Sequence, residues 1–470
     1  MVVGEIPEAV DLLVVGGGPG GYVAAIRAAH AGRSVLLVER AGAAGLGGTC
    51  LRDACIPSKA LLEVADVLQR GAELGNAGIH AEVSFDMAGW QSWREQLVSR
   101  LGRGISSLLA SAGVTVLAGT LHFTRRRQAV IEVPEGTVRY VEFRDVIIAT
   151  GARPRSLPHL PFDGVRVVDT AQILRRDSIP RSVVVVGAGR VGVELATTLA
   201  KLGSRVTLCE RAASVLPTYD LEVSRPVQSR LRQLGVEVLV DSEVVGGGDG
   251  TVRVARDGEE GVIEGDVVLA AVGRRPNTDD LGLDRLEART DEDGYLVVAG
   301  NQLVREHVAA IGDCTAGPAL AHRASAEAGV AVDALGGDEA VLPVEVIPDV
   351  VYGDPEVASA GLTLASARAE GVDVRTAKFP LSALGRAAMS AGASRGFARL
   401  VIRDDNSVVG VQLVGPHATE LIGTAVVALE MGAVVADLLE CVPPHPSLTE
   451  VFREAARLAA GSPIHVPMPR

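Results

Sequence analysis

Two closely spaced cysteines, Cys50 and Cys55, lie in the stretch "GGTCLRDACIPSKALL" at residues 47–62. Thiols at such a spacing can bind metals, form a structural bridge, fill a core or cycle between dithiol and disulfide. A zinc site needs about four ligands, and no second pair of cysteines or histidines is close in the sequence. We therefore predict no metal here, while core packing and redox chemistry both stay open on the pair alone.

Helix geometry constrains a disulfide between these two cysteines. The two Cα atoms must lie within about 7 Å of each other, whereas residues i and i+5 of an ideal α-helix are ~8.7 Å apart. A bridge therefore requires a distorted turn between Cys50 and Cys55. Gly47 and Gly48 before the pair and Pro57 after it allow such a distortion.

A second group that could do chemistry is His445 in the stretch "PPHPSLTEVFREAARLAA". His445 precedes a proline, so we expect an extended segment just ahead of a helix. Glu450 allows two interpretations. It completes a helix capping box with Ser447, or its carboxylate orients His445 for proton transfer. The residues alone favour the cap, and one carboxylate could serve both roles.

Two similar stretches, "VVGGGPGG" and "VVGAGRVG", predict the elements that position these groups. Each follows an apolar strand, opens a helix and leads to a second strand that ends in an acid. In such a unit the first glycine allows a tight turn, the second admits a pyrophosphate, and the third lets helix and strand pack closely. The residues are Gly16, Gly18, Gly21 and Glu39 in the first copy, and Gly187, Gly189, Gly192 and Glu210 in the second.

Two dinucleotide-binding units predict two nucleotides. Each helix N-terminus offers unpaired N–H groups to phosphates, and Glu39 and Glu210 would accept hydrogen bonds from ribose hydroxyls. The first unit, followed by the cysteine stretch, suggests FAD, and the second suggests NAD. Glu210 favours NAD over NADP because a carboxylate repels a 2′-phosphate, although the neighbouring Arg211 could meet such a phosphate.

The order of these elements predicts the domain organisation. "DVIIATGARP" and "VVLAAVGRRP" each give an apolar strand, a small-residue turn and a proline, so we infer one nucleotide domain interrupted by another. Strands that alternate with helices at 417–432 and 447–460 indicate an α+β end domain. The expected fold class is α/β, with two Rossmann-like domains, one inserted in the other, and a C-terminal α+β domain. The expected segments are 1–155 and 280–345 for the FAD-binding domain, 156–279 for the NAD-binding domain and 346–470 for the C-terminal domain.

Composition narrows the possible functions. The net charge of the 470 residues is −13, which disfavours nucleic-acid binding because that depends on cationic neutralisation of phosphates. No apolar, charge-free run is long enough to predict a membrane span, and the N-terminus lacks the basic region of a signal peptide. Five cysteines make no disulfide framework, so we expect a reducing cytoplasm.

The cysteine stretch resembles the redox motif of the flavoprotein disulfide reductases, most closely that of their dihydrolipoamide dehydrogenase branch. Other motifs match the family in order along nearly the whole chain: "ATGARP", "GAGRVGVELA", "AAVGRRPNT", "AAIGDCTAGPALAHRA", "DPEVASAGLT", "GFARLVI", "VGPHATELI" and "HPSLTE". The resemblance implies a class I pyridine nucleotide-disulfide oxidoreductase whose C-terminal domain forms a homodimer.

The resemblance also assigns roles to the cysteines and to the histidine. It makes Cys50 the interchange thiol that meets the substrate and Cys55 the thiolate that faces the flavin, with a redox-active disulfide between them. His445, oriented by Glu450, becomes the acid–base that serves the cysteine site of the other subunit.

The same resemblance completes the expected cofactor contacts. Lys59 would lie near the flavin and pair with Glu194, just after the second glycine motif. The other residues expected at the FAD are Gly48, Thr49, Thr150, Gly151 and Asp313, and those expected at the NAD include Glu194 and Gly273, which precedes Arg274.

The implied function is FAD-dependent oxidation of protein-bound dihydrolipoamide with NAD⁺ as acceptor. Because no lipoyl-like domain precedes residue 10, we expect the lipoyl group on a partner, either the acyltransferase core of a 2-oxoacid dehydrogenase complex or a lipoyl carrier protein. The alternatives are a mercuric or low-molecular-weight disulfide reductase that uses NAD(P)H and, from another class, a non-catalytic flavoprotein redox sensor or scaffold. The joint presence of the redox cysteines and the proton-handling residues argues against the sensor.

Three places depart from the residues usual in the family. They are "RDA" at 52–54 between the cysteines, Arg190 after the second glycine of the NAD motif, and "PP" at 443–444 before the histidine. None removes a core redox residue, and all three bear on the exact substrate.

Overall fold

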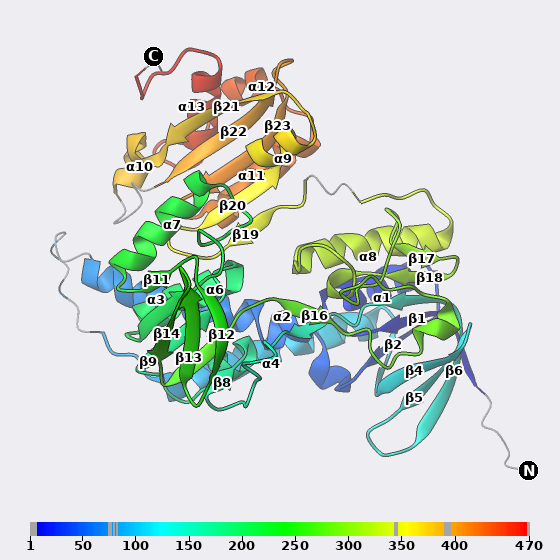
Figure 1. Cartoon of the computed structure of the whole chain (residues 1–470). Coiled ribbons are helices and arrows are strands. Elements are labelled where there is room, and N and C mark those ends of the chain that lie inside the picture. Colours follow the sequence, from blue (N-terminus) through cyan, green and yellow to red (C-terminus); the bar gives the residue numbers. More distant parts are fainter. Residues whose placement is uncertain are drawn as a thin grey trace, which may run out of the picture. The chain divides into compact units, whose positions relative to one another are not determined.

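The computed structural model describes residues 7–73, 78, 80, 83–342, 346–389 and 396–467 (Figure 1). The chain divides into two compact units. Unit 1 comprises Met1–Ser58, Ala88–Arg155 and Gly273–Leu342, and unit 2 comprises Lys59–Met87, Ser156–Val272 and Pro343–Arg470. The predicted fold class is confirmed, and the bounds of the four predicted domain segments stay a prediction.

Unit 1 is built on a mixed sheet whose centre is parallel. Strand β1 (Glu8–Val15) lies between β2 (Val35–Glu39) and β6 (Val138–Ile148), and the sheet order is β17-β18-β6-β1-β2-β3. Strands β3, β2, β1, β6 and β18 run parallel. The remaining strands are β3 (Thr115–Ala118), β4 (Thr120–Arg125), β5 (Gln128–Glu132), β17 (Leu303–Arg305) and β18 (Val308–Ala310), with the small pair β7 (Ala152–Pro154) and β16 (Arg274–Pro276).

Successive residues of β1 face opposite sides of this sheet and are buried on both. Leu13 and Val15 join one apolar cluster, whereas Leu12 and Val14 join another. This alternation follows from the period of two in a strand, and burial of both faces is typical of parallel sheets. The helices of unit 1 are α1 (Pro19–His30), α2 (Gly48–Arg52), α4 (Met87–Ser111) and α8 (Ala321–Gly336), with short 3₁₀ turns η1 (Gly42–Gly45), η3 (Leu283–Leu286) and η4 (Gly312–Cys314). Helix α3 (Cys55–Glu73) begins in unit 1 and continues into unit 2.

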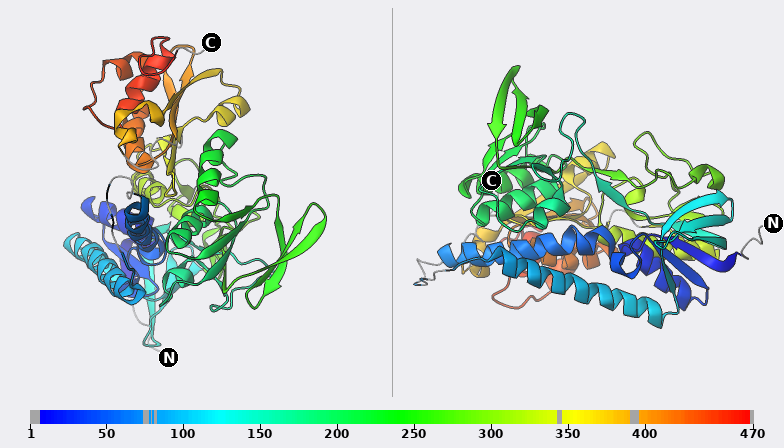
Figure 2. Two further views of the ribbon diagram at one scale, coloured as in Figure 1. Left: turned by 90° about the vertical axis from the view of Figure 1, so that its left-hand side faces the viewer. Right: turned by 90° about the horizontal axis from the view of Figure 1, so that it is seen from below.

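Unit 2 contains a second parallel sheet in the order β11-β10-β9-β15-β8. Its central strand β9 (Ser182–Val186) is buried at every position. The other strands are β8 (Val167–Val168), β10 (Arg205–Cys209), β11 (Glu237–Leu239) and β15 (Val267–Ala270), and the accompanying helices are α5 (Thr170–Leu174), α6 (Arg190–Lys201) and α7 (Leu221–Gln233). A three-stranded antiparallel sheet, β12 (Glu243–Gly248), β13 (Thr251–Arg256) and β14 (Glu259–Glu264), projects from the side of the parallel sheet and is green in Figure 2.

The C-terminal part of unit 2 is an antiparallel sheet with helices, as predicted. Its strand order is β19-β20-β23-β22-β21. The strands are β19 (Asp349–Val351), β20 (Val357–Gly361), β21 (Val374–Pro380), β22 (Phe397–Arg403) and β23 (Val408–Val414). The helical segments are α9 (Leu364–Ala369), η6 (Leu381–Ala383), α10 (Gly385–Ala388), α11 (Ala418–Glu430), α12 (Val435–Glu440) and α13 (Glu450–Ala459). The helix predicted over 417–432 is confirmed as α11.

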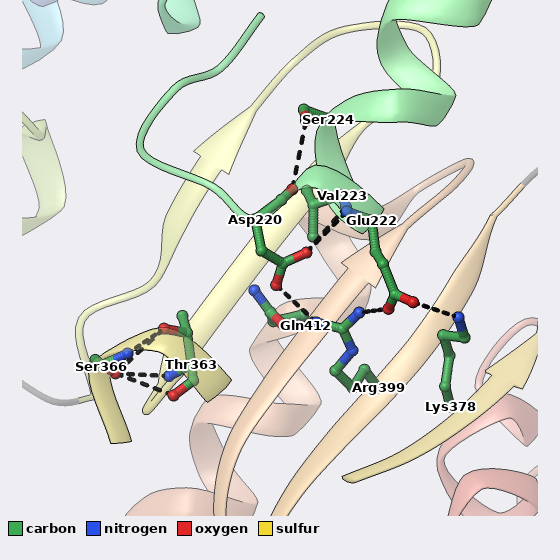
Figure 3. A network of polar contacts seen from close by, with 9 residues as sticks. All are labelled: Asp220, Glu222, Val223, Ser224, Thr363, Ser366, Lys378, Arg399 and Gln412. Carbon is green, nitrogen blue, oxygen red and sulfur yellow. Dashed lines mark hydrogen bonds and ion pairs between the residues drawn. The ribbon is translucent and has the colours of Figure 1, made fainter. Parts of the chain in front are cut away.

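A network of polar contacts centred on Arg399 connects α7 to this C-terminal sheet within unit 2 (Figure 3). Asp220 caps α7 by accepting the backbone N–H groups of its first turn. Arg399 on β22 is only 3% exposed and donates to Asp220 Oδ2 at 2.7 Å, to Gln412 Oε1 at 2.8 Å and to Glu222. Lys378 adds an exposed ion pair to Glu222 at 3.1 Å. The buried guanidinium therefore satisfies groups on two elements at once.

Replacing Arg399 should loosen this connection. In Arg399→Leu, Asp220 and Gln412 lose a charged donor, which should lower the free energy of opening in α7 and β22 by roughly 1–3 kcal/mol. Native-state hydrogen exchange of amides in these two elements measures this change. Lys378→Met is the matched control, because an exposed ion pair contributes less than about 1 kcal/mol. Equal effects from the two substitutions would contradict a special role for the buried arginine.

Among the described helices, none combines the length and the apolar character that a membrane crossing requires.

Candidate active site

The first glycine turn lies between β1 and α1 in unit 1. Gly16 has a φ of +106°, and a Cβ there would lie 2.3 Å from the carbonyl oxygen of Ala149. A Cβ on Gly21 would lie 1.8 Å from the oxygen of Gly16. Gly18 differs, since nothing lies within 4 Å of its Cβ position, and as N-cap of α1 it makes no side-chain hydrogen bond. The turn is therefore closed on the protein side and open where a ligand would approach.

The second glycine turn, between β9 and α6 in unit 2, repeats this geometry. Gly187 has a φ of +97°, and its Cβ would lie 2.6 Å from the oxygen of Ala271. A Cβ on Gly192 would lie 1.8 Å from the oxygen of Gly187. Gly189 faces open space and caps α6 without a side-chain hydrogen bond. Both turns thus leave room for a pyrophosphate at an uncapped helix N-terminus.

The predicted acids lie against these turns. Glu39 Oε2 accepts the backbone N–H of Gly17 at 2.7 Å, and Glu210 Oε2 accepts that of Ala188 at 2.7 Å. Glu39 ends β2 and Glu210 directly follows β10, and both strands neighbour their glycine turns. Each carboxylate keeps further lone pairs for a ribose hydroxyl. The two sites therefore fit dinucleotides.

The cysteine stretch packs against the first glycine turn. The N–H of Gly47 donates to the carbonyl oxygen of Gly17 at 2.9 Å. Gly48 has a φ of +57°, and its Cβ would lie 2.8 Å from the Cα of Gly18. Only glycine permits this approach, which places the next residue, Thr49, at the start of α2 beside the nucleotide turn.

The helix is interrupted between the two cysteines. Helix α2 carries Cys50 and ends at Arg52, whereas Cys55 begins α3. In between, Asp53 has a φ of −127°, and the N–H groups of Asp53 and Ala54 both donate to the oxygen of Thr49 at 2.9 Å. The predicted distorted turn is therefore confirmed. Cys50 and Cys55 are both half-buried, and the disulfide between them stays a prediction.

Arg52, one of the departures from the family, turns back onto the same loop. Its Nε donates to the carbonyl oxygen of Leu46 at 3.0 Å, and a Cβ on Gly102 of α4 would lie 3.0 Å from its guanidinium. The arginine therefore braces the loop ahead of the cysteines against α4.

The other residues predicted for the FAD lie at the ends of neighbouring strands in unit 1. The carbonyl oxygens of Thr150 and Gly151, after β6, accept hydrogen bonds from Asn277 at 3.0 and 2.9 Å. Asp313 follows β18 in η4 and forms an ion pair with Arg274 Nε at 3.3 Å. These positions match the rule that ligands bind at the carboxyl ends of parallel strands.

Three residues around these contacts escaped the sequence analysis. Asn277 and Arg274 come from a segment more than a hundred positions away from β6, so no spacing rule links them. Glu327 is fully buried and accepts the N–H of Gly312 at 2.6 Å and an ion pair from Arg323 at 2.7 Å. The four-residue spacing of Arg323 and Glu327 on α8 was a usable signal. Burial raises the pKa of Glu327, and Arg323 opposes that shift.

Gly273 was predicted for the NAD, yet it belongs to unit 1, whereas the second glycine turn belongs to unit 2. Its φ is +106°, and its carbonyl oxygen accepts the N–H of Arg155 at 3.0 Å. Its assignment to the NAD stays a prediction.

The predicted pair of Lys59 and Glu194 is present in unit 2. Lys59 Nζ lies 2.6 Å from Glu194 Oε2, and the Glu194 side chain is 8% exposed. The other carboxylate oxygen of Glu194 accepts the backbone N–H of Tyr352 at 2.9 Å, and the Lys59 ammonium lies 5.0 Å from the centre of the Tyr352 ring. Tyr352 was not foreseen, because only the folded chain brings it to Lys59.

His445 and Glu450 also form the predicted pair. His445 Nδ1 lies 2.9 Å from Glu450 Oε1, while Glu450 Oε2 accepts the N–H of Ser447 at 2.8 Å. Burial acts to raise the pKa of Glu450, but the Ser447 N–H and His445 outweigh it and lower that pKa. One carboxylate thus contacts both the imidazole of His445 and the N–H of Ser447. The helix begins at Glu450 rather than near 447, and the Ser447 hydroxyl pairs with Thr449, so the capping box is only half formed.

Two of the remaining cysteines, Cys209 and Cys314, are buried. Burial raises the pKa of Cys209 to about 12 and that of Cys314 to about 11, so both stay thiols at neutral pH. Cys441 is exposed. In the part of the chain that the structure describes, no three histidine, cysteine, aspartate or glutamate side chains gather as metal ligands.

The geometry of the second turn predicts different outcomes for two glycines. Gly189→Ala places its methyl group in open space, so the fold should persist while the NADH affinity falls about tenfold or more, because the methyl group meets the pyrophosphate. Gly192→Ala drives its methyl group into a backbone oxygen and should destabilise unit 2 by roughly 1–3 kcal/mol. NADH titration together with thermal unfolding separates the two effects.

Gly423→Ala is the control, because Gly423 lies in α11 and also has nothing within 4 Å of its Cβ position. It should leave the NADH affinity unchanged and, as an alanine in a helix interior, raise the stability of unit 2 by no more than about 1 kcal/mol. Unchanged NADH affinity in Gly189→Ala would show that no pyrophosphate lies at this turn.

Comparison with known proteins agrees with this architecture. Residues 10–328 match the pyridine nucleotide-disulphide oxidoreductase family model, and residues 347–456 match the dimerisation domain of that family. The dihydrolipoyl dehydrogenases of Geobacillus stearothermophilus and Bacillus subtilis are each 39% identical to the chain and match 99% of it, covering 99% and 100% of their own lengths.

Solved structures give the same result. LpdA of Mycobacterium tuberculosis matches 96% of this chain and 100% of its own at 28% identity, with a TM-score of 0.87. The flavoprotein disulfide reductase RclA of Escherichia coli matches 95% of this chain and 99% of its own at 24% identity, with a TM-score of 0.82, which supports the fold alone. The chain belongs to the pyridine nucleotide-disulphide oxidoreductase family.

Proposed function

We propose that this chain oxidises protein-bound dihydrolipoamide with NAD⁺, using FAD and a redox-active pair of Cys50 and Cys55. The observation that carries the proposal is the interrupted helix of the cysteine stretch, which packs on the first glycine turn. The full-length relatives named dihydrolipoyl dehydrogenase support the substrate. A mercuric or glutathione-type reductase and a non-catalytic sensor have no separate observation in their favour.

The cysteines would carry out the thiol chemistry. A substrate thiolate attacks Cys50 Sγ, the bond between Cys50 and Cys55 breaks, and Cys55 leaves as a thiolate. The positive end of a helix favours negative charge, and Cys55 is the first residue of α3. The second substrate thiol then displaces Cys50, so that the dithiol becomes a disulfide and gives up two electrons and two protons.

His445 would handle the protons. Because Glu450 holds Nδ1, the Nε2 atom can accept the proton of the substrate thiol. We propose that the cysteines are served by His445 of the partner subunit, as the matched dimerisation domain suggests. Proton transfer would then require the homodimer.

The chain's own residues would hold both cofactors. The first turn, with Gly18, Glu39 and Asp313, would bind FAD, and the second, with Gly189 and Glu210, would bind NAD. The chemistry that bound FAD would supply is transfer of the two thiol electrons, with one of the two protons, to NAD⁺. The lipoyl group would be presented by another chain, such as an acyltransferase core or a carrier protein, in the cytoplasm.

The decisive experiment compares three reactions of the purified flavoprotein: NAD⁺ reduction by dihydrolipoamide, NADPH oxidation by glutathione disulfide and NADPH oxidation by Hg²⁺. We expect turnover only in the first. Cys50→Ser should abolish that turnover and leave the flavin bound, because the attacked sulfur is lost while the glycine turn is intact. Cys441→Ser, which alters an exposed cysteine, should keep full activity. Absence of dihydrolipoamide oxidation, or full activity of Cys50→Ser, would overturn the proposal.

Glu450→Gln tests the proton path. The glutamine amide would donate to Nδ1, leaving Nε2 protonated and unable to accept, so kcat should fall at least about a hundredfold. The lowered pKa of Glu450 keeps its carboxylate charged at neutral pH. The stabilising contact of this carboxylate with His445 is therefore fully present above about pH 4.3, the ordinary pKa of a glutamate, and is lost only as the pH falls below that value. Ser447→Ala is the control, since it retains the backbone N–H; its kcat should change less than twofold. Comparable losses in the two variants would point to a local structural role for Glu450.

A further inference from the structure

Arg190 places a cation at the N-terminus of α6, in the proposed NAD site. It is the first residue of α6, directly after Gly189, whose Cβ position is open. A positive charge at a helix N-terminus is opposed by the helix dipole, so a guanidinium at this position needs a negative partner. The identity of this partner therefore bears on the role of Arg190.

In the structure the partner of Arg190 is Asp349. The guanidinium forms an ion pair with Asp349 Oδ1, and the side chains are 28% and 33% exposed. Asp349 is the first residue of β19, which packs against α6 within unit 2. It also lies beside Tyr219: burial raises the pKa of Tyr219, and the Asp349 carboxylate raises it further. Asp349 is therefore held by the fold, whereas Arg190 is a long side chain that can change partner.

A bound dinucleotide would offer Arg190 a second anion. Its diphosphate would lie at the N-terminus of α6, and an arginine fork fits phosphate oxygens with two parallel hydrogen bonds. Asp349 and the diphosphate would then compete for one guanidinium. The 2′-hydroxyl of the adenosine ribose is the part that Glu210 would contact, so the competition should not distinguish NADH from NADPH.

We propose that Arg190 is a nucleotide-binding residue and that Asp349 limits cofactor affinity by holding it. The inference deepens the proposed function and rests on α6 being the NAD-binding helix. Because Asp349 competes for the guanidinium, it lowers the affinity for the nucleotide. Weaker binding favours release of the product NADH, a step that often limits turnover.

A double-mutant cycle with Arg190→Met, Asp349→Asn and the combined variant tests the competition. The probes are NADH, ADP-ribose, which keeps the diphosphate, and AMP, which lacks it. We expect Asp349→Asn to tighten binding of ADP-ribose and NADH by about tenfold or more, and Arg190→Met to weaken it by a similar factor, because that is what one charge-assisted hydrogen bond contributes. The combined variant should match Arg190→Met, and AMP should bind equally to all.

Two further variants keep the test sharp if Arg190→Met disturbs the fold. Arg190→Lys keeps the charge without the fork and should bind ADP-ribose with intermediate affinity. Arg205→Met is the control. It removes an exposed arginine at the start of β10, the end of the strand far from Glu210, and should leave every affinity unchanged.

The inference is overturned if the effects of the two substitutions are independent, if Asp349→Asn weakens ADP-ribose, or if AMP changes as much as ADP-ribose. Failure of the parent function gives a different result, because the unmodified flavoprotein would then bind neither NADH nor ADP-ribose. Binding by the unmodified protein with no effect of the variants removes only the role of Arg190 and Asp349.

Discussion

The contact on which the rest of the structure depends is the approach of a helix to its own glycine turn. In both units a Cβ on the third glycine, Gly21 or Gly192, would lie 1.8 Å from the carbonyl oxygen of the first. Because no Cβ intervenes, the helix N-terminus packs closely at the end of the sheet, and its uncapped N–H groups face outward. The acid of the second strand then reaches the same turn, and in unit 1 the cysteine stretch packs on it through Gly48. The first glycine turn and the cysteine stretch are thereby placed side by side by one backbone constraint.

A second geometric constraint, the distance between Cys50 and Cys55, bears on the proposed disulfide. A regular helix would keep residues five apart too far from each other for a disulfide. The chain ends α2 at Arg52 and begins α3 at Cys55, and the carbonyl oxygen of Thr49 accepts two N–H groups across the break. The same break gives Cys55 the first position of a long helix, which suits a leaving thiolate. The interruption thus serves both the formation and the opening of the proposed disulfide.

Features that repeat or follow a fixed spacing could be predicted from the sequence. The two glycine turns, their acids and the distorted turn between the cysteines depend on local geometry, and all are present. Contacts that depend on distant segments could not be predicted from residues alone. Nothing in the sequence links Tyr352 to Lys59 or Arg274 to Asp313, since these pairs meet only after folding. The pair of Lys59 and Glu194 was predicted through family resemblance, because no spacing rule connects positions 59 and 194.

Helix α6 shows how these long-range contacts support the site. Arg190, Glu194 and Lys201 lie along the helix, and each contacts the segment that runs from β19 to β20. Their partners, in the same order, are Asp349, the N–H of Tyr352 and Asp354. Two of these residues also hold α3, because Glu194 binds Lys59 and Lys201, only 4% exposed, binds Asp66. If Arg190 turned to a bound nucleotide, the contacts of Glu194 and Lys201 would still hold α6, and both of these lead back to α3. Lys59 and the proposed NAD-binding helix are therefore in direct contact, through the buried carboxylate of Glu194.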